Sequence, residues 1–161
     1  MPITLHQISI ETYTNALTLL KSLLQKAQSH VSAASLPTAR LADDMYTLTG
    51  QVQTASNIVK AGIYRLLPEL GENPVWADDE KTLDDLIARC DKTLALLERA
   101  TPEMVNGRED GPSETRLGNG TVIRGDVKAY GILRKEGVPL GKVDYLTHFA
   151  AGLEVRPPVA N

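Results

Sequence analysis

Residues 41–63 of this 161-residue chain read LADDMYTLTGQVQTASNIVKAGI, and this stretch decides the fold. Apolar side chains recur in it every three or four positions, at Leu41, Met45, Leu48, Val52, Ala55, Val59 and Ile63. At about 100° per residue, all of them fall on one face of an α-helix. The spacing therefore predicts a long amphipathic helix over residues 39–66, which Pro68 and the turn residues 71–74 bring to an end.

Two other stretches carry the same periodicity. Residues 9–29 predict a first helix with Ser9 as its N-cap, and its apolar face holds Ile10, Tyr13, Leu17, Leu20, Leu24 and Ala27. A third helix is predicted from Asp78 or Asp79 to Arg99, and its apolar face holds Leu83, Ile87, Cys90, Leu94 and Leu97. Trp76 lies just before the third helix, and we expect it to hold that helix against the others.

The last third of the chain is less regular. Residues 116–123 predict a small hairpin with Gly-Asn-Gly at its tip, and residues 126–136 predict a short helix. Three apolar stripes bury one another by meeting around a shared core. We therefore predict an all-α, up-down helical bundle over residues 1–146, with three long helices, one short helix and a minor β-hairpin. Residues 147–161 are expected to form an extended tail.

Composition narrows the function classes. The net charge is −3 and aromatic residues make up 4% of the chain, so a basic or base-stacking surface for nucleic acid is not expected. The sequence has no run of about 18 apolar residues and no secretory signal, which predicts no membrane association. The lone cysteine, Cys90, fits a reducing compartment, and we expect a cytoplasmic protein in which this residue is part of the core.

Histidine spacing gives no metal motif. His6, His30 and His148 lie far apart in the sequence, without an HxxxH or HExxH pair. Metal ligands must converge within about 2.0–2.2 Å of one ion, and nothing in this spacing brings the three rings together. We therefore expect no metal and no cofactor.

The polar residues beside the second apolar stripe are the candidate site. On a helix over residues 39–66, Asp44 and Gln51 fall on one edge of the stripe and Ser56 falls within it, whereas Gln53, Tyr46 and Asn57 point away. Tyr130 on the short helix could add a phenol to the same cleft. Asp44, Gln51, Ser56 and Tyr130 thus form a candidate small-molecule pocket. The alternative is structural: Asp44 sits in a first turn or pairs with Arg40, and Gln51 and Ser56 satisfy neighbouring backbone groups.

Two blocks of sequence carry a family resemblance. ARLADDM at 39–45 is followed by QVQTAS at 51–56, and AYGILR at 129–134 is followed by GVPLGKVDYL at 137–146. In this order they resemble a DinB/YfiT-like family of unknown function, the DUF1993 type, over residues 3–146. The resemblance implies a helical bundle, often dimeric, with no agreed activity. RGDVK at 124–128 stands where that family has Pro-Asn, aromatic residues and a histidine, so the resemblance implies a shortened last helix here.

These observations lead to three hypotheses about function. The first is a metal-independent bundle protein that binds a small molecule in a cleft between helices or self-associates as a homodimer. The second is an accessory enzyme of small-molecule biosynthesis, of the isomerase or cyclase type, in which Asp44 or Tyr130 moves a proton. The third is a scaffold unit without a ligand.

Overall fold

A computed structural model describes residues 3–116, 122–126 and 154–156. The chain divides into two compact units, one formed by residues 10–101 and the other by residues 1–9 together with 102–161. The first unit contains the three long helices and all of the candidate site described below.

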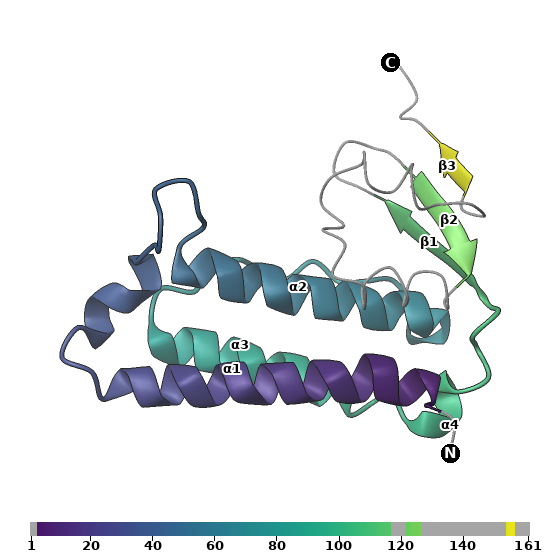
Figure 1. Cartoon of the computed structure of the whole chain (residues 1–161), viewed down its shortest axis with the longest axis horizontal. Helices are drawn as coiled ribbons and strands as arrows, with labels where there is room; N and C mark the ends of the chain where they lie inside the picture. Colours follow the sequence, from purple (N-terminus) through teal and green to yellow (C-terminus); the bar gives the residue numbers. More distant parts are fainter. Residues whose placement is uncertain (1–2, 117–121, 127–153, 157–161) are drawn as a thin grey trace. The chain divides into compact units, whose positions relative to one another are not determined.

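The first unit consists of α1 (Thr12–Gln28), α2 (Leu48–Leu66) and α3 (Leu83–Leu97), which lie side by side along their lengths (Figure 1). Two side-chain contacts, Gln28 to Asp84 and Lys21 to Asp91, fix α1 antiparallel to α3. α2 runs in the same direction as α3, because residues 71–82 return along the helices in extended form (Figure 1). The prediction of three long amphipathic helices is confirmed.

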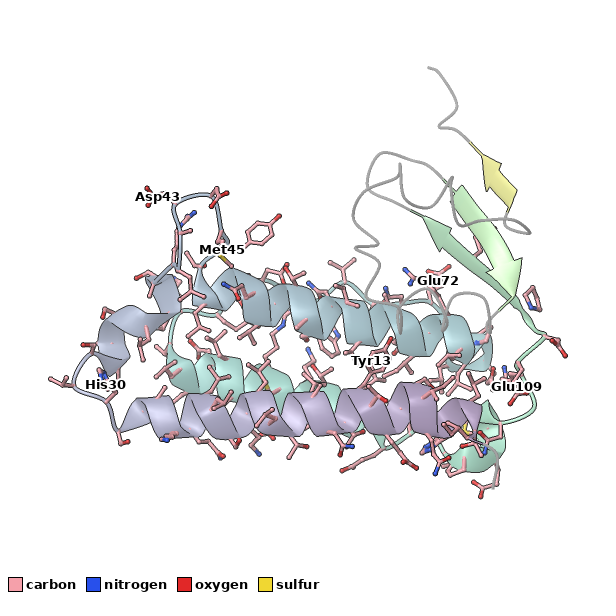
Figure 2. The ribbon with its side chains drawn as sticks, viewed as in Figure 1. Tyr13, His30, Asp43, Met45, Glu72 and Glu109 are labelled. Atoms are coloured by element: carbon pink, nitrogen blue, oxygen red, sulfur yellow. The ribbon has the colours of Figure 1, made fainter. Side chains whose placement is uncertain are left out.

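α2 begins at Leu48, so the prediction that residues 39–47 are helical is wrong. The Thr47 hydroxyl caps the helix by accepting a hydrogen bond from the Gly50 amide at 3.1 Å. Before it, Arg40 donates to the Met45 carbonyl at 3.0 Å and closes a loop, on which Figure 2 shows Asp43 and Met45. Leu41 is 87% exposed, although it has the correct spacing for the apolar stripe.

Both ends of the other two helices also differ from prediction in detail. Ser9 does not cap α1, because its hydroxyl donates to the Leu5 carbonyl at 2.6 Å within a π-helical turn, η1 (Gln7–Glu11), that leads into the helix. α3 starts at Leu83, four to five residues later than predicted. Its start is a capping box, in which the Thr82 hydroxyl accepts from the Asp85 amide and the Asp85 carboxylate accepts from the Thr82 amide.

The core of this unit lies where the three apolar stripes meet. One cluster of this core is Leu24, Val52, Leu83, Leu86 and Cys90, with partly buried residues of the short helix η2 (Ala33–Thr38) packed against it. Burial raises the pKa of the Cys90 thiol to about 11, so this group is neutral at physiological pH. Cys90 is therefore a core residue, as predicted. Tyr13 of α1 lies over Gly62 of α2, where an added Cβ would stand 3.4 Å from the phenol oxygen (Figure 2).

The remaining described elements are short. The helix η3 (Pro68–Leu70) follows α2, and α4 (Pro102–Val105) belongs to the second unit. The strands β1 (Pro112–Arg116), β2 (Val122–Asp126) and β3 (Glu154–Arg156) form an antiparallel sheet in the order β1-β2-β3. The predicted hairpin is present with longer strands, and its tip lies outside the described residues. The predicted helix over 126–136 also lies outside them, except that Asp126 ends β2. None of the described helices is long and apolar enough to cross a membrane.

Candidate functional site

The structure separates the residues that the sequence placed in one pocket. Asp44 is exposed on the loop before α2, whereas Ser56 is fully buried and its hydroxyl bonds Thr93 Oγ1 at 2.8 Å. Gln51 donates to the Tyr46 carbonyl at 3.0 Å, which is the backbone-satisfying role given as the alternative. Tyr130 lies outside the described residues. Asp44 lies outside the predicted site because α2, the helix that was expected to carry it, begins only at Leu48.

The opposite edge of α2 carries the more developed polar site. Gln53 donates to Glu80 Oε2 at 2.7 Å, Asn57 donates to Asp78 Oδ1 at 3.3 Å, and Lys60 donates to the Pro74 carbonyl. As the residue number rises along α2, that of its partner falls, so the connection 71–82 runs antiparallel to α2. Gln53 and Asn57 were predicted to point away from the bundle, and that prediction is wrong because this connection covers them.

Arg89 of α3 also binds the connection 71–82, from the side of α3. Its Nη1 donates to the Ala77 carbonyl at 3.0 Å and to Glu80 Oε1 at 2.6 Å. Its Nη2 donates to Asn57 Oδ1 at 2.9 Å and pairs with Asp78 Oδ1 at 2.8 Å. The side chain is only 2% exposed, so these charge-assisted bonds form largely out of water. Arg89 therefore ties α2, α3 and the connection together.

Trp76 stands at the centre of three cations. The Lys92 ammonium lies 4.2 Å from the ring centroid, the Lys60 ammonium 4.8 Å, and the Arg89 guanidinium carbon 5.9 Å. Each falls within the range of about 6 Å over which an aromatic face attracts a cation. Because Lys60 comes from α2 and the other two from α3, the ring joins both helices.

A hollow of about 350 Å³ opens beside Trp76. Its lining includes Trp76, Asp79, Glu80, Ala88, Arg89 and Lys92, with Asp85 from the capping box. The volume is at the lower end of the range found for small-molecule sites, about 300–1,000 Å³. The wall combines one aromatic ring with charged groups of both signs.

Lys60 and Glu80 at this site have shifted pKa values. Burial lowers the pKa of Lys60, and the positive charges of Arg89 and Lys92 lower it further, against an opposing effect from Asp78. Burial by itself would raise the pKa of Glu80, but hydrogen bonds from Gln53 and Arg89 outweigh it and hold the pKa below 4.5. Glu80 is therefore ionised whenever the protein is near neutral pH.

The lowered pKa of Glu80 makes a prediction about acid stability. Its contribution is fully present above the unfolded value of 4.5 and is lost as the pH falls through the folded value. We expect Glu80→Gln to melt at a lower temperature than the unchanged protein at about pH 7, with the difference shrinking towards about pH 3. Thermal melts followed by circular dichroism across this range measure it. A difference that stayed constant with pH would contradict the ionic role of Glu80.

Sequence reasoning had one usable signal for this site. Arg89 lies three residues after Leu86 and one before Cys90, so it occupies a position close to the apolar face of α3. An arginine there indicates a buried charge that must find partners. Most of its partners come from residues 71–82, and hydrophobic periodicity does not predict the path of that segment.

Within the described part of the chain, no group of three or more His, Cys, Asp or Glu side chains could hold a metal ion.

Comparison with known proteins places the fold and the family. A crystal structure of a DinB family member protein from Shewanella denitrificans has 25% sequence identity and a TM-score of 0.64, over 98% of this chain and 96% of that chain. This similarity confirms the all-α, DinB-like bundle class. No curated protein gives a significant match. The family model described as a domain of unknown function (DUF1993) matches residues 5–124 and 126–146, and the chain therefore belongs to the DUF1993 family.

Proposed function

We propose that this protein binds a small molecule in the hollow beside Trp76. The observation that carries the proposal is the form of that hollow: about 350 Å³ with an aromatic wall and exposed charges of both signs. This site differs from the pocket predicted at Asp44, Gln51, Ser56 and Tyr130, the last of which lies outside the described residues.

The rigidity of the hollow supports the proposal. Arg89, 2% exposed, makes four polar contacts that fix Asn57, Ala77, Asp78 and Glu80. A binding site held by such contacts loses little conformational entropy when a ligand enters it. The part of the wall formed by Ala77, Glu80 and Arg89 is thus organised before binding.

Trp76 also provides a fluorescence signal for ligand binding. It is the only tryptophan in the chain, so intrinsic fluorescence excited at its absorption edge reports on this one site. We expect a fractionated extract of small metabolites to change that fluorescence, and native mass spectrometry to detect the bound mass.

A pair of matched variants locates the binding. Ala88 lines the hollow and is exposed on α3, so Ala88→Phe fills the site without disturbing the core. Ala95 is also exposed on α3 but is not part of the lining, and Ala95→Phe is the control. Loss of the fluorescence response in Ala88→Phe and its retention in Ala95→Phe support the proposal. An equal response in both variants overturns it.

Self-association is a second candidate, favoured by one feature of α1. Leu19 and Leu23 are 61% and 56% exposed, and their i, i+4 spacing places them next to each other on one helix face. Sedimentation velocity tests it: we expect a dimer whose dissociation constant rises in Leu19→Gln. A chain that sediments as a monomer at every concentration contradicts this candidate.

A further inference from the structure

The charged groups that line the hollow divide into those already engaged and those left over. Glu80 binds Gln53 and Arg89, and Asp85 accepts two backbone amides in the capping box of α3. The nitrogens at the tip of Arg89 are engaged as well. Lys92 and Asp79 are the lining charges that remain, and both side chains are exposed.

On the positive side, the Lys92 ammonium is available to an incoming anionic group. Lys92 lies over Trp76 at 4.2 Å from the centroid and has donors left to offer. A carboxylate supplies acceptors for them. The Nε of Arg89 has no hydrogen-bond partner within the described residues, but it is buried and is not counted among the donors open to a ligand.

On the negative side, Asp79 offers a carboxylate to a cationic group. Three carboxylates and two cations line the hollow, which gives it a formal charge of −1. A purely anionic ligand enters against that charge, and a purely cationic one leaves Lys92 without an acceptor. A ligand with one charge of each sign satisfies both sides and adds no net charge.

Resting on the proposed function, we infer that the ligand is a small zwitterion of the α-amino-acid class. Its carboxylate binds Lys92, its ammonium group binds Asp79, and an apolar side chain lies beside Ala88 within the hollow. The hollow of about 350 Å³ is large enough for one such molecule.

The test uses L-phenylalanine as the probe, with Trp76 fluorescence as the signal. Phenethylamine lacks the carboxylate, and N-acetyl-L-phenylalanine lacks the ammonium group. We expect each analogue to bind about tenfold more weakly than L-phenylalanine, because each loses one charge-assisted contact.

Three single variants assign the two ends of the probe. Lys92→Gln should remove the preference for L-phenylalanine over phenethylamine and leave the preference over the N-acetyl compound. Asp79→Asn should do the reverse. Lys26→Gln, an exposed lysine on α1 outside the lining, should change neither preference.

The outcomes separate this inference from the proposed function. If either analogue binds as tightly as L-phenylalanine, the zwitterion class is overturned. If it does not bind but the metabolite extract still gives a response that Ala88→Phe abolishes, the class is likewise overturned while the proposed function stands. If the extract gives no such response either, both fail.

Discussion

Arg89→Leu is expected to lower the free energy of unfolding by about 3–5 kcal/mol. The side chain is 2% exposed and pairs with Glu80, whose own side chain is 12% exposed. Removing the guanidinium leaves that carboxylate largely buried without its cation, and it also leaves the Ala77 carbonyl and Asn57 without their donor. Urea denaturation followed by circular dichroism measures the change.

Two further variants test whether the loss of stability comes from the buried pair of Arg89 and Glu80. Arg99→Leu removes an exposed arginine after the end of α3 and should change stability by no more than about 0.5 kcal/mol. The double variant Arg89→Leu with Glu80→Leu should recover part of the loss, since no buried carboxylate is left behind. If Arg89→Leu lowers the free energy of unfolding no more than Arg99→Leu does, the contacts of Arg89 do not hold the connection 71–82 in place.

Helical periodicity predicted the bundle well and its boundaries poorly. The stripes of all three long helices contain core residues, including Leu24, Val52 and Cys90, whereas Leu86 is fully buried beside the predicted stripe of α3. Leu41 and Met45 continue the stripe of α2 into a loop, because Thr47 caps the helix and Arg40 supplies donors to the carbonyls before it. Hydrophobic periodicity alone does not predict whether a helix continues for one more turn or begins at a capping residue such as Thr47.

The candidate site was predicted least well, and the reason is its long-range construction. The sequence identified Trp76 as a residue that holds α3 and Cys90 as part of the core. It assigned Gln53 and Asn57 to solvent because, on an isolated helix, polar residues opposite the apolar stripe face water. In the structure their partners are Glu80, Asp78 and Arg89, which lie more than 20 residues away in sequence.

Leu86→Ala is the second change for which a large effect is expected, a loss of about 3–5 kcal/mol in the free energy of unfolding. Leu86 is fully buried and packs with Leu24 of α1, Val52 of α2 and Cys90 of α3. Truncation removes its methyl groups and leaves a cavity where three helices meet, so the lining cannot collapse without moving a helix. Chemical denaturation with urea gives the value directly.

Leu41→Ala provides the matched control, since it makes the same chemical change on a side chain that is 87% exposed. It should cost no more than about 0.5 kcal/mol, because the methyl groups it removes already contact water. The difference between the two variants measures how much stability comes from the burial of Leu86. Equal losses in both would contradict the packing of Leu86 at the place where the three helices meet.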